Sequence, residues 1–346
     1  MTNRYPKQKG VALIIVLMIV AIVSVLATEM GSRLQLQIKR SSNIKDNNQA
    51  YWYAMSAEQY ARKSIKDLAE QDRDLIYLDQ AWNQDFVFPI DGGGIEAKLV
   101  DLQSCFNLNA LRDPGGTSNN SSDSDSDQTT DATVQGNSST ALPDRVVAFQ
   151  RLLELVDGDI PTYNVETVRD SLVDWLDDDD QSSQLGAEDG EYESLQFPYL
   201  PANNFLAHKS ELRLIHGMEV KWLEKLFELV CVIPSDSLFV INVNTVTEEN
   251  AAVIAAATGL SLADAQSVLS NRGPEGFQEV TDFLAEPSIT ALSLSDEQEK
   301  WFDVTTSYFM LDIRTKYNDA TFAMQSVLKI NEDNSVSVVS REFNGF

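Results

Sequence analysis

Apolar residues dominate one stretch close to the N-terminus. Residues 11–28, eighteen in all, contain no charged side chain, and most are Val, Ile, Leu, Met or Ala. A helix of this length spans roughly 27 Å, which is enough to cross the hydrocarbon core of a bilayer. Residues 1–10 are polar and basic, so the positive-inside rule places them in the cytoplasm and the rest of the chain outside. We therefore expect one membrane-spanning helix.

The helical pattern continues beyond the apolar stretch without a break. Small and apolar residues recur at spacings of three and four, which predicts a single stripe along one face of a helix. No Pro or Gly interrupts residues 32–88, so membrane-spanning and soluble halves belong to one long helix. The stripe consists of Ala50, Ala54, Ala57, Ala61, Ile65 and Leu68.

Alternating patterns predict strands after this helix and again at the C-terminus. Residues 95–102 alternate directly after Gly92-Gly93-Gly94, which is typical of a strand that leaves a tight turn. Near the C-terminus, β-branched and aromatic residues alternate in four segments, namely 302–309, 311–317, 321–329 and 336–341. We expect these segments to form an antiparallel sheet that packs on the N-terminal helix.

The middle of the chain has a helical pattern. Residues 143–176 and 203–230 show helical periodicity, and we expect Trp175, Trp222 and Phe227 to anchor their core. Residues 113–141 contain almost no large apolar side chain, so we predict a disordered loop there.

Residues 237–300 form a further helical unit. Its two central helices meet at Gly259 and resemble the helix-hairpin-helix modules of DNA-uptake proteins. Such modules hold phosphates with basic residues, whereas Arg272 is the only Arg or Lys between Glu248 and Glu299. We therefore interpret this unit as a packing module.

Three interpretations of the N-terminus compete. It is a secretory signal cleaved after Val25-Leu26-Ala27, an uncleaved signal anchor, or a prepilin-type leader that ends at Gly10. Only the third explains a glycine at the junction between the basic and apolar residues. The uninterrupted helix that follows also favours it, because a cleaved signal normally leads into a break.

The composition excludes several classes of function. The formal net charge of the 346-residue chain is −27, which disfavours nucleic-acid binding and favours divalent cations or basic partners. The two histidines are too few for a His-based metal site, and no catalytic motif is present. Cys105 and Cys231 form no C-x-x-C pair, which leaves open a single disulfide or two buried thiols.

Four consecutive aspartates, Asp177 to Asp180, form the most distinctive chemical feature. Read as a calcium loop, Asp177 takes position 1, Asp179 position 3 and Glu188 position 12. Ser182 stands where an EF-hand has its glycine, so the pattern predicts a carboxylate loop for a hard cation and no complete EF-hand. A solvated acidic loop without an ion remains the alternative.

Several segments resemble those of one protein family. Residues 9–14 are similar to the leaders of type IV pilins and type II secretion pseudopilins, but Ile15 replaces their usual Glu. The minor pseudopilin K (GspK) family of type II secretion systems also lacks this Glu. Further similarity to that family lies in Phe106–Leu111, Asp174–Asp177, Gly186–Asp189, Tyr199–Asn203, Glu211–Ile215 and Gly217-Met218.

The resemblance implies an α+β fold, in which a pilin-like helix packs on an antiparallel sheet and a large helical domain is inserted. It implies a leader in residues 1–10 and a membrane helix in 11–30. The pilin-like domain would then comprise 31–111 and 301–346, with the insertion at 112–300. Prepilin peptidase would cleave after Gly10 and methylate Val11.

The resemblance also implies a function and a location. The chain would be a non-enzymatic subunit at the tip of the pseudopilus, anchored in the bacterial inner membrane with its bulk in the periplasm. Its implied partners are the minor pseudopilins I and J, the assembly platform, the secretin and the secreted proteins, with no nucleic acid. A type IV pilus or DNA-uptake pilin and an exported calcium-binding hydrolase remain the alternative functions.

For the metal, the resemblance implies two calcium ions in the helical insertion. The ligands that we expect are Asp174, Asp177, Asp179, Glu188 and Asp189, with Asn203 as a weaker candidate.

Overall fold

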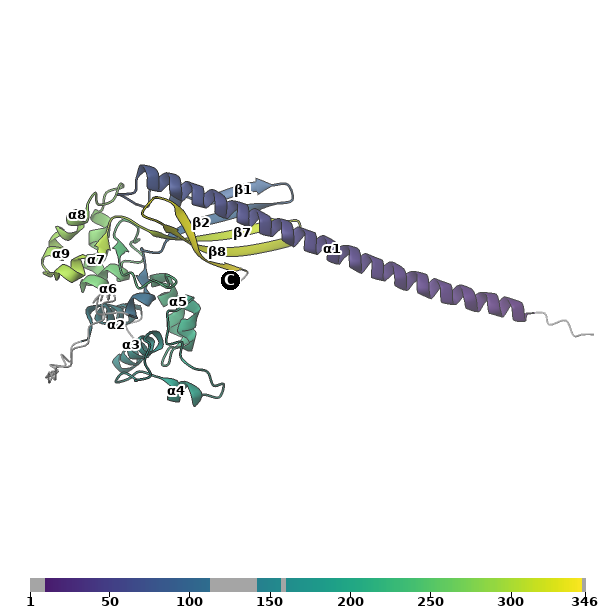
Figure 1. Cartoon of the computed structure of the whole chain (residues 1–346), viewed down its shortest axis with the longest axis horizontal. Helices are drawn as coiled ribbons and strands as arrows, with labels where there is room; N and C mark the ends of the chain where they lie inside the picture. Colours follow the sequence, from purple (N-terminus) through teal and green to yellow (C-terminus); the bar gives the residue numbers. More distant parts are fainter. Residues whose placement is uncertain (1–9, 113–141, 157–159, 344–346) are drawn as a thin grey trace, which may run out of the picture.

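The computed structural model describes residues 10–112, 142–156 and 160–343. The first nine residues of the expected leader and the predicted loop at 113–141 lie outside the described residues. Helix α1 (Val11–Gln71) is a single helix of 61 residues, and its N-terminal half projects from the rest of the molecule (Figure 1). At 1.5 Å per residue its length is about 90 Å, roughly three times the hydrocarbon thickness of a bilayer.

A five-stranded antiparallel sheet lies beside the C-terminal half of α1. Its order is β1-β2-β7-β8-β9, so the C-terminal strands pair with the first hairpin. The predicted α+β architecture is therefore confirmed, whereas β1 was not predicted. The strands are β1 (Phe86–Ile90), β2 (Gly93–Asp101), β7 (Tyr308–Tyr317), β8 (Ala320–Ile330) and β9 (Val336–Phe343).

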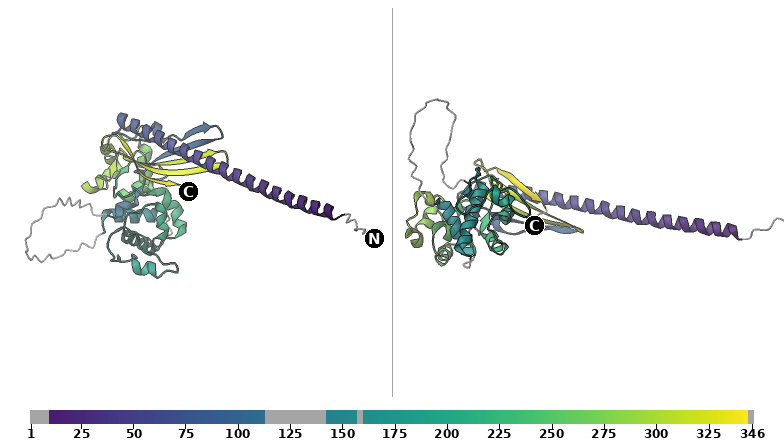
Figure 2. Two further views of the ribbon diagram at one scale, coloured as in Figure 1. Left: turned by 45° about the vertical axis from the view of Figure 1, so that its right-hand side comes forward. Right: turned by 90° about the horizontal axis from the view of Figure 1, so that it is seen from below.

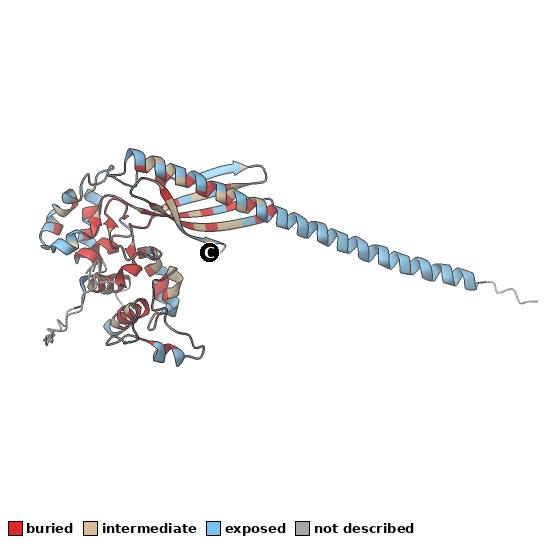
Figure 3. Ribbon diagram, viewed as in Figure 1, coloured by how far each residue is buried: buried red, intermediate tan, exposed pale blue. Residues whose placement is uncertain are grey.

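The alanine stripe of α1 packs against one face of this sheet. Ala54, Ala57 and Ala61 are buried, together with Ile65, against inward-facing residues of β2, β7 and β8. The small alanine side chains let the helix backbone approach the sheet closely. Large side chains of the sheet, such as Phe309, fill the space between the helix and the strands. Burial along α1 begins only at Asp46, and the residues before it are exposed (Figure 3).

One charged residue interrupts the apolar stripe. Glu58 of α1 is fully buried, and Arg341 of β9 donates two hydrogen bonds to its carboxylate, at 2.6 and 2.8 Å. The hydroxyl of Ser326 donates a third hydrogen bond. Burial raises the pKa of Glu58, but the bonds from Arg341 and Ser326 outweigh burial and hold the pKa below its usual 4.5. This pair fixes the edge strand β9 to α1.

We predict that Arg341→Met lowers the free energy of unfolding by roughly 2 kcal/mol, because it leaves the buried Glu58 carboxylate unpaired. The folded-state pKa of Glu58 is lowered, so its stabilising effect is complete above pH 4.5 and disappears as the pH falls through the lowered pKa. Denaturant titrations at several pH values measure this effect. If Arg341→Met lowers the free energy of unfolding by the same amount in a Glu58→Gln variant, which has no carboxylate to leave unpaired, this explanation is wrong.

The chain between β2 and β7 forms a helical unit with its own core. This unit lies at the end of the sheet away from the projecting half of α1 (Figure 1). Phe106–Leu111 and Trp301–Val304 belong to this core, which therefore includes residues on both sides of 112–300. Its elements are β3 (Phe106–Asn107), η2 (Leu108–Leu111), α2 (Asp144–Val156), α3 (Thr162–Leu176), α4 (Asp189–Glu193), η3 (Lys209–Leu214), α5 (Val220–Leu229), β4 (Val230–Cys231), β5 (Ile241–Asn242), α6 (Ala252–Thr258), α7 (Leu262–Asn271), α8 (Val280–Leu284), α9 (Pro287–Thr290), α10 (Asp296–Glu299) and β6 (Phe302–Asp303), while η1 (Ala81–Asn83) precedes the sheet.

Several boundaries differ from the predictions. The range 143–176 contains two helices, because Pro161 starts α3 afresh. The range 203–230 is α-helical only in α5, and the predicted strand at 302–309 is divided between β6 and β7. Trp175 and Trp222 are buried as expected, while Phe227 is half-buried at the edge of the core. Helices α6 and α7 meet at an angle of 111° around Gly259, whose φ is +84°.

Asp101, at the end of β2, joins the sheet to the helical unit. Its buried carboxylate accepts hydrogen bonds from the hydroxyls of Thr245 and Thr306, and from the backbone N–H of Gln103 at 2.7 Å. The amide of Asn242 donates to the same carboxylate and, at 3.1 Å, to the carbonyl of Ile76. Nearby, Cys105, directly before β3, forms a disulfide with Cys231 of β4.

We predict that Asp101 makes stability depend on pH. Burial raises its pKa to about 6, although the hydrogen bonds from Thr245, Thr306, Gln103 and Asn242 oppose the rise. Between pH 4 and 6 the folded state then holds more protons than the unfolded state. The free energy of unfolding therefore falls as the pH rises through this range, by up to roughly 3 kcal/mol. In Asp101→Asn the fall should be absent, and an unchanged pH profile of denaturant unfolding would refute the assignment.

Candidate metal centre

The acidic residues of α3 share one face of the helix. Asp170 and Asp174 are four residues apart and Asp177 follows three residues later, so the helical repeat aligns all three. Asp177 is the residue at which α3 ends, and its backbone N–H donates to the carbonyl of Val173 at 3.0 Å. The chain then leaves the helix, which brings the following aspartates back toward this face.

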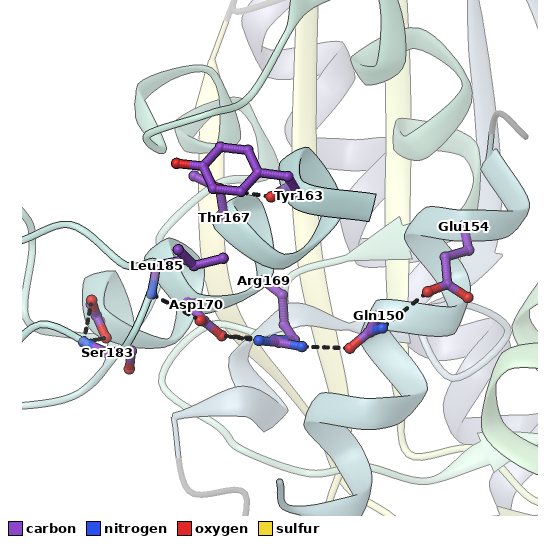
Figure 4. A network of polar contacts seen from close by, with 9 residues as sticks. Gln150, Glu154, Tyr163, Thr167, Arg169, Asp170, Ser183 and Leu185 are labelled. Carbon is purple, nitrogen blue, oxygen red and sulfur yellow. Dashed lines mark hydrogen bonds and ion pairs between the residues drawn. The ribbon is translucent and has the colours of Figure 1, made fainter. Parts of the chain in front are cut away.

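Asp170 has a structural partner. Arg169 donates to its carboxylate at 2.7 Å and also to the side chain of Gln150, and both Arg169 and Asp170 are buried (Figure 4). The other oxygen of Asp170 accepts the backbone N–H of Leu185 at 3.2 Å. This network ties the loop after α3 to α2 and α3, and Arg169 offsets the charge of Asp170.

Asp174 positions the same loop from one turn further along. It is fully buried, and both carboxylate oxygens accept the backbone N–H of Ser183, at 3.0 and 3.1 Å. Gly186 lies so close that a Cβ there would sit 1.9 Å from Oδ2 of Asp174. A glycine is therefore required at 186, because any side chain would displace the carboxylate.

Asp177, Asp179 and Glu188 form the centre of the site. One carboxylate oxygen from each lies within 4.8 Å of the others. Both oxygens of Glu188 and Oδ1 of Asp177 are buried and have no hydrogen-bond partner among the described residues. Burial, together with repulsion from neighbouring carboxylates such as Asp174, raises the pKa of Glu188 to about 7 and that of Asp177 to about 6.

Asn203 approaches this centre from the other end of the loop. Its amide nitrogen donates to the carbonyl of Asp179 at 3.3 Å and to the side chain of Asp180 at 3.4 Å. Its Oδ1 is buried without a hydrogen-bond partner in the described chain, and its φ of +43° is unusual for a residue with a side chain. An amide oxygen held in this way would offer a cation a neutral ligand beside the carboxylates.

The structure thus brings together three of the five expected ligands. Asp174 is adjacent but its oxygens are used by Ser183, and Asp189 is exposed at the start of α4. The loop spacing at positions 1, 3 and 12 was the signal that identified the three. The environment of Asn203 depends on a contact between residues 24 apart in sequence, which no local pattern reveals.

The geometry of these oxygens suits calcium. Ca²⁺ lies about 2.4 Å from each oxygen ligand, so oxygens on opposite sides of the ion are about 4.8 Å apart. The three carboxylates satisfy this limit, and unpartnered buried oxygens are the ligands that a cation would use.

Comparison with known proteins identifies the family. Two family profiles described as type II secretion system protein K match residues 104–235 and 241–305. Type II secretion system protein K of Aeromonas hydrophila is 34% identical over 98% of both chains, and that of Klebsiella pneumoniae is 31% identical over 97% of both. The chain belongs to the type II secretion system protein K family. These relatives support the predicted role of a minor pseudopilin in type II secretion.

A solved structure shows the same fold. The GspK-GspI-GspJ complex from enterotoxigenic Escherichia coli contains a chain that is 27% identical, with a TM-score of 0.72. The similarity covers 89% of the present chain and all of the other. The fold of the protein K family therefore extends over both the sheet and the helical unit.

We predict that calcium raises the melting temperature of the full chain in detergent, because the ion binds only the folded cluster. At a hundredfold excess over the dissociation constant, the gain is about 2.7 kcal/mol. Asp177→Ala combined with Glu188→Ala should abolish the shift and, in chelator, should melt above the unsubstituted chain because carboxylate repulsion is relieved.

The control is Asp178→Ala, which removes an exposed neighbouring charge outside the group of three. It should retain the calcium-dependent shift. Equal melting of the unsubstituted chain with calcium and with chelator would refute a bound ion.

Proposed function

We propose that this protein caps the tip of the type II secretion pseudopilus, where it initiates assembly with the minor pseudopilins I and J. The observation that carries the proposal is the position of the helical unit. It lies beside the end of α1 remote from the N-terminus, and the views of Figure 2 agree on this placement. A further subunit stacked above would collide with it, whereas subunits below would meet α1 and the sheet beside it.

The exposed part of α1 provides the polymerisation surface. Its apolar residues before position 39 are all exposed in the isolated chain, and they include Ile15 at 52%. In this position most pilins carry a carboxylate, which is thought to neutralise the N-terminus of a neighbouring subunit. A subunit at the tip has no such neighbour above it, so an isoleucine is compatible with that place.

Aromatic side chains extend this surface onto the soluble domain. Trp52 and Tyr60 of α1 are 62% and 60% exposed. The ring of Tyr60 stacks on Phe86 of β1 at 5.0 Å, and Phe88 lies a further 6.2 Å along the strand. Exposed aromatic groups in this number are typical of protein interfaces. Because the related GspK chain was solved in a complex with GspI and GspJ, we assign this surface to subunits I and J.

Processing and location follow from the same assignment. Prepilin peptidase would cleave between Gly10 and Val11 and methylate Val11, which begins the helix. Before assembly α1 would anchor the protein in the inner membrane with its bulk in the periplasm, where the Cys105–Cys231 disulfide is stable. The assembly platform, the secretin and the secreted proteins would be its further partners. Its role would be mechanical, with no reaction catalysed.

Calcium would stabilise the helical unit at the tip. The half-buried Asp177 and the buried Glu188 keep oxygens without hydrogen-bond partners in the described chain, so a bound calcium ion would stabilise the loop after α3. We place one ion at Asp177, Asp179, Glu188 and Asn203. The resemblance implies a second ion, and Asp174 could bind it only after a rearrangement, because both of its oxygens accept the N–H of Ser183.

The test combines processing with assembly. Intact-mass analysis of the protein from its own host should show a methylated N-terminus at Val11, and a start at Thr28 would refute the pseudopilin assignment. Purified I and J should form a complex with the protein, and Trp52→Ser should weaken it at least about tenfold because Trp52 lies on the proposed interface. Phe197→Ser, an equally drastic change on the remote helical unit, is the control and should leave the complex intact.

A further inference from the structure

The loop that connects α4 to η3 exposes apolar side chains. Phe197 is 79% exposed, Leu200 is 55% exposed and Leu195 is 41% exposed, all within six residues of chain. Scattered apolar residues are normal on a protein surface, but three in so short a segment form a patch. Prolines at 198 and 201 restrict the backbone between them and beside them.

The loop is nevertheless held firmly at its centre. The hydroxyl of Tyr199 donates to the carbonyl of Leu214 at 2.8 Å. Its ring lies 5.2 Å from that of Tyr192 and 6.3 Å from that of Trp175. Tyr199 therefore faces the core while Phe197 and Leu200, on either side of it, face solvent. The exposed positions belong to an ordered segment and do not result from poor packing.

Residues of the candidate metal centre lie on both sides of the apolar patch in the sequence. Glu188 directly precedes α4 and Asn203 lies in the loop three residues beyond Leu200, and both carry buried oxygens without a partner in the described chain. An ion bound by both residues would close the segment between them at its base. Without the ion, the buried oxygens of Glu188 and Asn203 have no partner in the described chain, so nothing joins the two ends of the segment through them.

The surroundings of the patch are strongly acidic. Residues 170–208 contain ten Asp or Glu residues and no Lys or Arg. The exposed side chains of Glu191 and Glu193 lie on α4, directly before the patch. An anionic lipid surface would be repelled, and a second copy of this chain, with a net charge of −27, would bring more negative charge. Charge complementarity favours a protein partner in which an apolar segment is flanked by basic residues.

We propose that the loop carrying Leu195, Phe197 and Leu200 is a calcium-dependent docking surface for an apolar protein segment with basic flanks. The proposal rests on the proposed function, since the loop lies on the helical unit that would face outward from the tip. Calcium closes the base of the loop and lowers the local negative charge. The remaining carboxylates then orient the basic flanks while the apolar residues supply the buried contact.

The test uses the full chain in zwitterionic lipid nanodiscs, with empty nanodiscs as the background. The probe is a fluorescent synthetic peptide with a central Leu- and Phe-rich segment and lysines at both ends. Its partner probe carries glutamates in place of the lysines. Fluorescence anisotropy in excess calcium should show binding of the lysine peptide only. Chelation, or Phe197→Ser combined with Leu200→Ser, should weaken binding at least about tenfold.

The controls separate this proposal from the function on which it rests. Trp52→Ser should bind the peptide normally while it loses the complex with I and J, and the Phe197→Ser, Leu200→Ser variant should do the reverse. A calcium-dependent melting shift in the latter variant shows that its metal centre has folded. Equal binding of both peptides, binding that survives chelation, or unchanged binding by the loop variant would each overturn the docking surface. Loss of the I and J complex in the loop variant alone would instead refute the proposed function.

Discussion

The whole structure depends on one helix that meets two different environments. The first part of α1 is apolar around its full circumference, as a helix surrounded by lipid or by other helices requires. Its second part keeps only a narrow stripe of alanines against the sheet, where the close approach of helix and strands buries Phe309 and Leu311. Because no break separates the two parts, any force on the membrane-facing half is transmitted directly to the sheet.

Polar and covalent contacts supplement a small apolar cluster, which includes Ile233 and Tyr308, where the helical unit meets the sheet. Asp101 gathers hydroxyl, amide and backbone donors from both parts of the chain, and the disulfide closes a separation of 126 residues beside it. A single apolar interface would allow sliding, whereas directional hydrogen bonds and a covalent link fix orientation. This arrangement suits a subunit whose helical unit would have to keep a fixed position at the end of a fibre.

The candidate metal centre shows how local structure prepares a site that an ion would complete. The repeat of α3 aligns Asp170, Asp174 and Asp177, and the first two fold the loop through backbone N–H groups. These hydrogen bonds use the outer carboxylates and leave Asp177 with Glu188 unsatisfied in a buried position. The cost of desolvating these groups is the physical reason to expect a cation there.

The sequence by itself determined the long helix, the C-terminal strands and the identity of the central carboxylates, because each rests on spacing between near neighbours in the chain. Periodicity of three and four fixes a helical face, alternation fixes a strand, and positions 1, 3 and 12 bring Asp177, Asp179 and Glu188 together in one loop. Only the tertiary structure decided the rest. The edge strand β1, the pairing of Glu58 with Arg341 and the approach of Asn203 to the aspartates depend on contacts between residues that are distant along the chain. Such contacts arise when separate elements pack, and no local pattern of side chains encodes them.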